Sequence, residues 1–316
     1  MNFDVVCVGS ALLDVYMKSD KFIKVTSPIF SEGVALCEVY GGKTEISEAE
    51  VTSGGGGTNN AVSFARKGLK TGLIAEMGTD LVASFIKLEL EKEGVDTSML
   101  VQESGEETGI SSIMVANDGG RSVAVHRGAS KMLTKEDVLW DRLNPKWIYI
   151  SSLGGEMALL EGLIGHAKSK GIKVAVNPGM SEIEKISGWG GMKLFEGVDV
   201  LLVNRQEATK LSGIDFSDES VWQGDQCIEG PKICVITDGS NAGRVFVGGV
   251  CKKYEVNPIN AVEQTGAGDG FGSALVAALI LGKDVDTAIL WAKKQSASVV
   301  SHMGPKKGLL TLEQLS

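Results

Sequence analysis

Short apolar runs rich in β-branched residues alternate with longer, helix-like runs along almost the whole chain, and this alternation restricts the fold most strongly. Strand-like runs lie at residues 3–9, 71–78, 146–152, 172–179, 198–204 and 232–239. Helix-like runs lie at residues 59–69, 80–94, 156–171, 206–213, 270–282 and 285–301. Because the strand-like runs are continuously apolar, both faces of each strand should be buried. The pattern predicts an α/β fold, a single domain over residues 1–316, with a mostly parallel sheet covered by helices on both faces.

Two stretches interrupt the alternation. Residues 34–53, VALCEVYGGKTEISEAEVTS, contain two extended runs around a turn at Gly41 and Gly42. Residues 108–127, TGISSIMVANDGGRSVAVHR, predict a hairpin that turns at NDGG. We expect the segments of about 16–53 and 107–127 to form a small separate sheet, a lid over a site at the strand ends. The alternative is two surface hairpins without a function.

Charge and hydropathy exclude several classes of protein. The chain of 316 residues has 31 Lys and Arg against 40 Asp and Glu, a net charge of −9, which argues against a nucleic-acid partner. No apolar run reaches the roughly 18 residues that a membrane span needs, and no cationic stretch precedes an apolar run at the N-terminus. We therefore expect a cytoplasmic protein with no membrane partner. The three histidines are scattered and do not have the spacing of a zinc site.

Two glycine-rich stretches each precede a helix-like run, SGGGGTNNAV at 53–62 and QTGAGDGFGSA at 264–274. Free N–H groups and the dipole at a helix N-terminus favour an anion or a hydroxyl-rich ligand. No P-loop is present, because its first glycine would fall at Cys37 ahead of Gly42-Lys43-Thr44. A dinucleotide motif also fails, because Phe271 stands where the third glycine belongs. A purely structural turn is the alternative for each loop.

Asp269 is a carboxylate set among small residues that leave the backbone exposed. Amides at Gly266, Ala267 and Gly268 could stabilise negative charge on a transferring phosphoryl group. The Asp269 carboxylate could accept a proton from a nearby hydroxyl, and phosphoryl transfer to an alcohol needs both functions. A bare helix cap at Asp269 would explain the carboxylate but not its small neighbours. The chemistry alone leaves both interpretations open.

GGGGTNNAVSFARKG and QTGAGDGFGSALVA, in this order and about two hundred residues apart, resemble the two signatures of the ribokinase-like (PfkB) carbohydrate kinases. The resemblance extends through VGSALLD, AVNPG, VNRQEA and VITDGSNAG, and so covers the whole chain. It implies a three-layer α/β/α domain with a small β-sheet lid. It also implies a kinase that uses ATP and Mg²⁺ and binds a small sugar.

The resemblance also implies roles for individual residues. Asp269 is similar to the catalytic base, and the residues similar to its anion hole are Gly266, Ala267 and Gly268. Those similar to the sugar-binding residues are Asp14, Gly55, Gly56, Asn59 and Arg127. Those similar to the ATP-binding residues are Asn177, Asn204, Thr237, Gly239 and Gly243. Glu207 completes an N-x-x-E motif that organises Mg²⁺, largely through water. Without the resemblance, Asp14 could be a polar residue at a strand turn. Arg127 could be a solvated hairpin residue, and Glu207 could be a first-turn helix carboxylate.

Departures from the family pattern concern a cation and the acceptor. Glu263 replaces the aspartate that helps to bind a monovalent cation, which leaves activation by K⁺ open. Leu12 replaces an asparagine of ribokinases, and ALLD is closer to adenosine kinases, whereas AVHRGAS resembles sugar kinases. We expect transfer to a primary hydroxyl of a ribose- or fructose-like sugar. A nucleoside kinase and a non-catalytic sugar-binding protein are the alternatives.

The lid also predicts a partner surface. Its hairpin carries Ile113, Val115, Val123 and Val125. If these apolar residues are exposed, they form a plausible surface for a homodimer.

Overall fold

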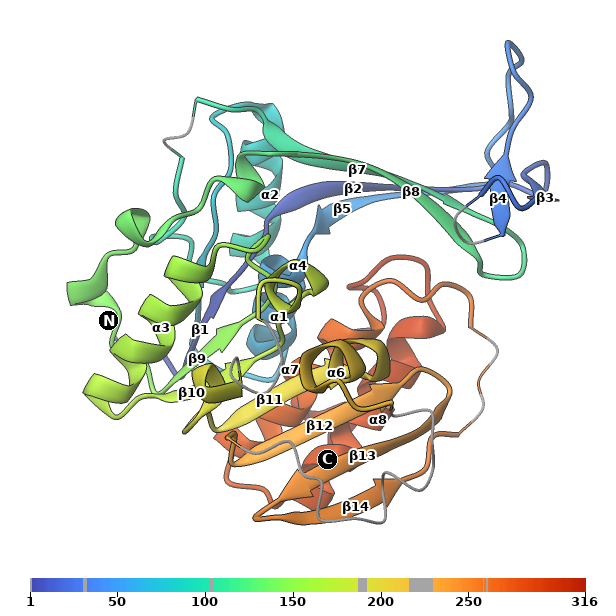
Figure 1. Ribbon diagram of the computed structural model, residues 1–316. Coiled ribbons are helices and arrows are strands. Elements are labelled where there is room, and N and C mark those ends of the chain that lie inside the picture. The colour runs from blue at the N-terminus through green and yellow to red at the C-terminus, as the bar shows by residue number, and fades with distance from the viewer. Residues whose placement is uncertain are drawn as a thin grey trace.

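The computed structural model describes residues 2–30, 33–102, 105–186, 192–215, 230–257, 259 and 261–316. An eight-stranded sheet has the order β14-β13-β12-β11-β10-β9-β1-β6 (Figure 1). Its parallel strands are β1 (Val5–Val8), β6 (Thr71–Ile74), β9 (Trp147–Ile150), β10 (Lys173–Val176), β11 (Val200–Asn204) and β12 (Ile233–Asp238). The strands β13 (Asn241–Val247) and β14 (Val250–Tyr254) extend one edge in antiparallel pairing.

Helices bury both faces of this sheet. One face packs against α1 (Gly56–Arg66), α2 (Leu81–Lys92), α7 (Ala267–Ile280), α8 (Val285–Val300) and α9 (Leu312–Leu315). The other packs against α3 (Met157–Lys170), α4 (Met180–Ile183) and α6 (Arg205–Ser212). Successive residues of β1 enter opposite cores, with Val5 and Cys7 in one and Val6 and Val8 in the other. The predicted three-layer α/β architecture is therefore confirmed.

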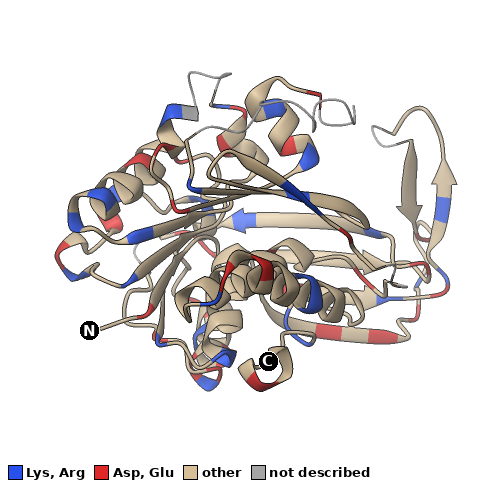
Figure 2. Cartoon of the chain, turned by 90° about the horizontal axis from the view of Figure 1, so that it is seen from below, with Lys and Arg blue, Asp and Glu red and all other residues tan. Residues whose placement is uncertain are grey.

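Short 3₁₀ helices complete the connections. They are η1 (Ala129–Lys131), η2 (Lys135–Asp137), η3 (Trp140–Arg142) and η4 (Met192–Phe195). Charged residues of both signs are interspersed over the outer helices, whereas most residues of the strands are uncharged (Figure 2). None of the described helices is both long and apolar enough to cross a bilayer.

A second, four-stranded sheet extends from the body in the order β5-β2-β7-β8 (Figure 1). Its strands are β2 (Leu12–Lys18), β5 (Glu48–Gly54), β7 (Thr108–Val115) and β8 (Arg121–Gly128). The predicted hairpin across NDGG is confirmed, since β7 and β8 pair antiparallel. The runs on either side of Gly41 and Gly42 do not pair with each other. Instead β4 (Val34–Cys37) pairs with β3 (Ile23–Thr26), and β5 pairs with β2.

One face of this small sheet packs on the body. Tyr16, Ile113, Val115 and Met303 form a buried cluster, in which Ile113 is 2% exposed and Val115 is fully buried. The expectation of exposed apolar residues was therefore wrong for Ile113 and Val115, whose side of the strands is covered by the segment that carries Met303. It is confirmed for Val123 and Val125 of β8, which are 49% and 45% exposed. The outer face of the sheet, whose apolar side chains lie opposite one another across β5, β2 and β7, is the more exposed one.

Arg66 joins three parts of the body at the end of α1. Its Nε and Nη2 donate to the two carboxylate oxygens of Glu93, at 2.8 and 2.6 Å. Its Nη1 donates to the carbonyl oxygens of Lys306 and Leu309, at 2.6 and 3.1 Å. The Arg66 and Glu93 side chains are only about one quarter exposed. This two-pronged contact therefore fixes the chain around Lys306 against α1.

Replacing Arg66 should destabilise the protein. We expect Arg66→Ala to lower the free energy of unfolding by about 1.5–3 kcal/mol, because partly buried, charge-assisted hydrogen bonds are lost. Urea unfolding monitored by circular dichroism measures this change. Lys252→Ala is the control, since Lys252 pairs with Asp286 on the surface and should cost less than about 1 kcal/mol. Equal midpoints for Arg66→Ala and the wild type would contradict the role of Arg66.

Candidate active site

The first glycine loop lies against the carboxyl ends of β1 and β9. A Cβ on Gly56 would come within 2.8 Å of the Ser151 side chain, and one on Gly55 within 2.6 Å of the Ser10 carbonyl oxygen. Gly55 also has φ of 89°, which L side chains rarely adopt. Side chains therefore do not fit at these positions. The glycines allow the backbone to approach the strand ends and let α1 begin there.

Asp14 lies beside this loop on β2. It is 5% exposed, and its Oδ2 accepts a hydrogen bond from the Tyr16 hydroxyl at 3.2 Å. A Cβ on Gly54 would lie 2.1 Å from the Asp14 carboxylate, so glycine is needed there as well. Burial raises the pKa of Asp14, and the Ser111 hydroxyl and the Lys306 ammonium oppose that rise. The carboxylate is thus held where the glycine loop leaves the small sheet.

The second glycine-rich stretch brings Asp269 to the start of α7. Gly266 has φ of 78° and is the N-cap, so the helix begins at Ala267 and Asp269 lies in its first turn. The interpretation of Asp269 as a bare helix cap is therefore wrong. Among the hydrogen bonds of the described residues, the backbone amides of Gly268 and Asp269 have no acceptor. These amides can bind an anion.

The Asp269 carboxylate is bound by the first glycine-rich segment. Its Oδ2 accepts from Asn59 Nδ2 at 2.9 Å, and its Oδ1 accepts from Asn60 Nδ2 at 3.3 Å. Burial raises the pKa of Asp269, while these hydrogen bonds and the Lys306 ammonium partly counteract it. A raised pKa makes the ionised carboxylate a stronger base. Asp269 and Asn59, which come from two distant segments of the chain, are therefore in direct hydrogen-bond contact.

Lys306 is a buried cation in this site that the sequence did not single out. Its ammonium donates to the Ser53 carbonyl oxygen, to Thr58 Oγ1 at 3.2 Å and to Asn59 Oδ1 at 3.0 Å. Lys306 is 4% exposed, and burial lowers its pKa to about 8 despite nearby carboxylates. In the sequence, Lys306 and Lys307 look like an ordinary pair of surface lysines. No local pattern separates the buried lysine from its neighbour.

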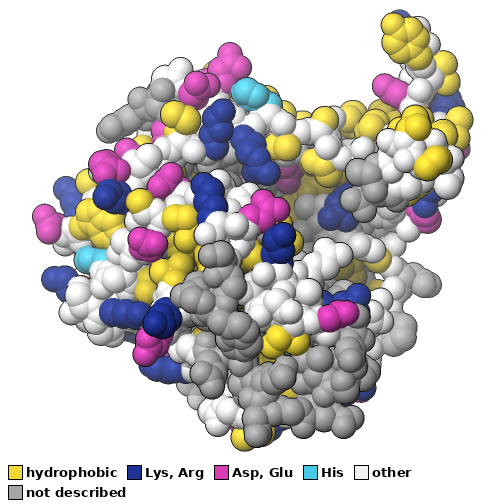
Figure 3. Space-filling view, in the orientation of Figure 1, with side chains coloured by type: hydrophobic (Ala, Val, Ile, Leu, Met, Phe, Trp, Pro, Cys, Tyr) yellow, Lys and Arg dark blue, Asp and Glu magenta, His cyan; other side chains and the backbone are white. Residues whose placement is uncertain are grey.

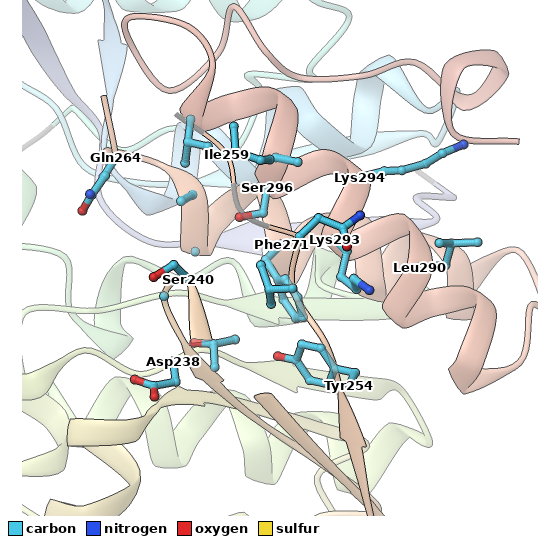
Figure 4. A pocket seen from close by; sticks show the side chains of 18 of the residues that line it. Asp238, Ser240, Tyr254, Ile259, Gln264, Phe271, Leu290, Lys293, Lys294 and Ser296 are labelled. Carbon is cyan, nitrogen blue, oxygen red and sulfur yellow. The ribbon is translucent and has the colours of Figure 1, made fainter. Parts of the chain in front are cut away.

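A cavity of about 780 Å³ opens beside the start of α7 (Figure 4). Thr237 and Gly239 line it, and Gly268 lies on its wall next to Asp269. Tyr254 and Phe271 also line it and stack with their ring centroids 5.9 Å apart. The cavity thus leads from these two rings toward the free amides of α7.

Gly243 does not line the cavity but permits its shape. A Cβ at this position would lie 2.2 Å from the Tyr254 ring. Tyr254 can therefore lie against β13 only because residue 243 has no side chain. Tyr254 and Phe271 were not found from the sequence, since single aromatic residues in apolar runs are most often core residues.

Three predicted residues lie at the carboxyl ends of β10 and β11 or just beyond them, and they do not line the cavity. Asn177 Nδ2 donates to the Leu202 carbonyl oxygen at 3.0 Å. Asn204 caps α6, since its Oδ1 accepts from the Glu207 amide at 2.9 Å and Glu207 Oε2 accepts from the Asn204 amide at 2.8 Å. Burial and the nearby Glu182 carboxylate raise the pKa of Glu207. The described residues contain no group of three or more His, Cys, Asp or Glu that could hold a metal ion.

Glu263 is fully buried just before the second glycine-rich stretch. Its Oε1 accepts from the Thr265 amide and hydroxyl, at 2.7 and 2.5 Å, and lies 3.5 Å from Arg121 Nε. Its Oε2 has no partner among the described residues. The predicted residue Arg127 is exposed on β8, and within the described part of the chain its guanidinium makes no ion pair or hydrogen bond.

Comparisons with known proteins identify the family and the fold of the chain. The family model described as pfkB family carbohydrate kinase matches residues 2–312. A ribokinase of Staphylococcus aureus is 26% identical over 324 residues, which cover 100% of this chain and 99% of that protein. A structure of Arabidopsis thaliana ribokinase complexed with ribose and ATP has a TM-score of 0.75 at 20% identity, covering 100% of this chain and 98% of the other. An adenosine kinase from Sinorhizobium meliloti also has a TM-score of 0.75 at 20% identity, with 99% and 98% covered.

Proposed function

We propose, from the premise that the chain belongs to the pfkB family of carbohydrate kinases, that it transfers the γ-phosphoryl group of MgATP to a primary hydroxyl of a ribose- or fructose-like sugar. One observation carries this proposal. The Asp269 carboxylate is hydrogen-bonded to the sugar-binding candidate Asn59, and Asp269 directly follows Gly268, which lines the cavity. A base in this position can reach a sugar on one side and a phosphoryl group on the other.

The proposed transfer needs few groups. Asp14 and Asn59 orient the sugar, and Gly55 and Gly56 let it approach the backbone. Asp269 accepts the proton of the primary hydroxyl, whose oxygen forms a bond to the γ-phosphorus. The bond between that phosphorus and the bridging oxygen breaks, and ADP leaves. Within the anion hole predicted at residues 266–268, the Ala267 amide donates to the Gln264 carbonyl oxygen at 3.3 Å. The amides of Gly268 and Asp269 are therefore the donors that stabilise the charge on the phosphoryl oxygens.

The cavity fits the nucleoside part of ATP. Aromatic rings at Tyr254 and Phe271 provide an apolar wall, and Thr237 and Gly239 border the path toward α7. Glu207, in the first turn of α6, would be the carboxylate for a hydrated Mg²⁺ ion bound together with phosphates, with Asn204 and Asn177 at the ends of the neighbouring strands β11 and β10. Mg²⁺ commonly keeps several waters and one or two carboxylates. When bound, Mg²⁺ neutralises charge on the phosphates. The exposed guanidinium of Arg127 on the small sheet is free to face the acceptor.

A panel of acceptors separates the sugar kinase from its alternatives. ADP release should be measured with ATP and ribose, deoxyribose, fructose or adenosine. Turnover with a sugar and none with adenosine is the result we expect. Turnover only with adenosine would assign a nucleoside kinase. Sugar binding in calorimetry without ADP release from any acceptor would assign a non-catalytic binding protein.

Asp269 provides the direct test of the mechanism. Asp269→Asn should lower kcat by about 10²–10⁴-fold, because the general base is lost, while thermal stability and ATP affinity stay close to those of the wild type. Asp286→Asn is the matched control, since Asp286 is an exposed first-turn residue of α8, and its kcat should be unchanged. Near-normal turnover of Asp269→Asn would remove the basis of the proposal.

The pH dependence of the wild type offers a second readout of Asp269. A protonated carboxyl group cannot accept a proton, so kcat should fall as the pH decreases through the pKa of Asp269. Because burial raises that pKa, the fall should be centred above the usual value of an aspartate. In Asp269→Asn this acidic limb should disappear.

Glu263 is the candidate ligand for a monovalent cation. Its unpartnered Oε2 fits such an ion, and the segment at 299–304 is adjacent, since the Val300 carbonyl accepts from the Glu263 amide at 3.3 Å. We expect higher turnover in potassium chloride than in tetramethylammonium chloride at equal ionic strength. Glu263→Gln should reduce this difference. Equal rates of the wild type in the two salts would contradict a cation site. The Glu263 carboxylate would then serve only as the ion-pair partner of Arg121.

The small sheet also supports a proposed homodimer. On its outer face, Leu13, Val15 and Met17 pair across strands with Ile110, Val51 and Met114. Val51 and Ile110 are 50% and 39% exposed. In Figure 3, hydrophobic side chains are visible along the arm that this sheet forms and at the far end of that arm, where the separate β3–β4 sheet lies. An apolar face of this kind is typical of a protein interface.

Light scattering at micromolar concentration tests the dimer. The wild type should have the mass of two chains, and the double variant Val51→Glu/Ile110→Glu the mass of one, because the charges oppose burial of the outer face. Val250→Glu, at an exposed residue of β14, should leave the dimer intact. A monodisperse monomer of the wild type would exclude the homodimer.

A further inference from the structure

Lys306 uses all its hydrogen-bonding capacity inside the protein. A lysine ammonium has three N–H donors and no acceptor. Its three acceptors here are the Ser53 carbonyl oxygen, Thr58 Oγ1 and Asn59 Oδ1. Ser53 begins the glycine-rich segment, and Thr58 and Asn59 both lie in the first turn of α1. Lys306 therefore has no donor left for a substrate. Apart from the effect of its charge, its influence on the site must pass through these partners.

The contact with Asn59 determines which way the amide of that residue points. The ammonium can only donate, so it requires the oxygen Oδ1 on its side. The NH₂ group is thereby directed to the Asp269 carboxylate, to which Nδ2 donates at 2.9 Å. In the flipped amide, NH₂ would face the ammonium and the amide oxygen would face the carboxylate. Both contacts would then be repulsive.

We infer that Lys306 is a positioning residue for phosphoryl transfer, which holds the Asn59 amide in the one orientation that donates to the Asp269 carboxylate. The inference rests on the proposed role of Asp269 as the base. The segment that carries Lys306 is itself fixed, since the Arg66 guanidinium binds the Lys306 carbonyl oxygen at 2.6 Å. The chain of contacts thus runs from α1 through Lys306 and back through Asn59 to the reacting carboxylate.

The charges around Lys306 agree with this arrangement. The carboxylates of Glu89, Asp14 and Asp269 favour its charged form, whereas burial and the Arg66 guanidinium oppose it. Glu89 also accepts from the Ser53 amide at 2.6 Å, on the other side of the same loop. In return, the ammonium lowers the pKa of Asp269. Lys306 therefore influences both the direction and the basicity of the Asp269 carboxylate.

The test compares Lys306→Met with the wild type in the full chain, using the best sugar of the acceptor panel. We expect kcat to fall by about 10- to 100-fold, since a misplaced catalytic group commonly costs about 10²-fold, with a smaller change in the KM for the sugar. The acidic limb of the pH profile of kcat should move to higher pH, because the cation that lowers the pKa of Asp269 is gone. Lys307→Met is the matched control, since Lys307 is half exposed and pairs with Glu50. It should retain kcat and the pH profile.

A double-mutant cycle tests whether Lys306 acts through Asn59. At a pH above the acidic limb, where Asp269 is ionised in every variant, Asn59→Ala and Asn59→Ala/Lys306→Met should have similar kcat values, since the second substitution then has no amide left to orient. Lys306→Gln can still donate to Asn59 Oδ1 and should recover part of kcat relative to Lys306→Met. It also provides the measurement if Lys306→Met does not fold.

The possible failures are distinguishable. If Lys306→Met, or Lys306→Gln in its place, keeps kcat within about twofold and leaves the acidic limb unmoved while Asp269→Asn is inactive, the role of Lys306 is overturned and the proposed function stands. Additive effects in the double-mutant cycle would likewise overturn it. If Asp269→Asn retains its turnover, the proposed function is contradicted, and the inference on Lys306, which rests on it, is contradicted as well.

Discussion

The close contact between the first glycine loop and the ends of β1 and β9 is the constraint on which the site depends. Side chains at Gly54, Gly55 or Gly56 would meet Asp14, Ser10 or Ser151 at less than 3 Å. With only hydrogen at these positions, α1 can start directly above the parallel strands and direct Asn59 and Asn60 at the start of α7. The parallel sheet brings the carboxyl ends of its strands to one edge. Because the glycines permit close approach there, the start of α1, the start of α7 and the Asp269 carboxylate lie together at this edge.

Sequence patterns predicted the parts of the fold that depend on local periodicity. Continuous apolar runs correctly indicated strands buried on both faces, and NDGG correctly placed the hairpin of β7 and β8. The hairpin of β13 and β14 was not foreseen, because its strands, NAGRVFV and VCKKY, lack both a continuous apolar run and a regular alternation, and they lie at the edge of the sheet. Strand partners were also beyond reach, as the pairing of β4 with β3 shows. A local pattern cannot reveal which distant segment covers a face, so the burial of Ile113 was missed.

The same division applies to the candidate site. Asp269 and Asn59 stand in glycine-rich stretches whose composition is unusual enough to attract notice, and the structure joins them by a hydrogen bond. Lys306 has no such local signature, and its burial arises only from contacts with residues 53–59. Glu263 was noticed as a departure from a family pattern, but its contact with Arg121 required the folded hairpin. Residues whose chemistry depends on a partner far away in the chain are the hardest to identify from local sequence patterns.

The separation of these partners along the chain has a consequence for folding. Asn59 lies 210 residues from Asp269 and 247 residues from Lys306, and Arg66 lies 240 residues from the Lys306 carbonyl that it binds. Contacts between such distant residues close very large loops and tend to form slowly. The sheet and its helices can therefore assemble while the buried polar groups of the glycine loop still await their partners. The recovery of activity during refolding would then report the last docking event, later than any signal from secondary structure.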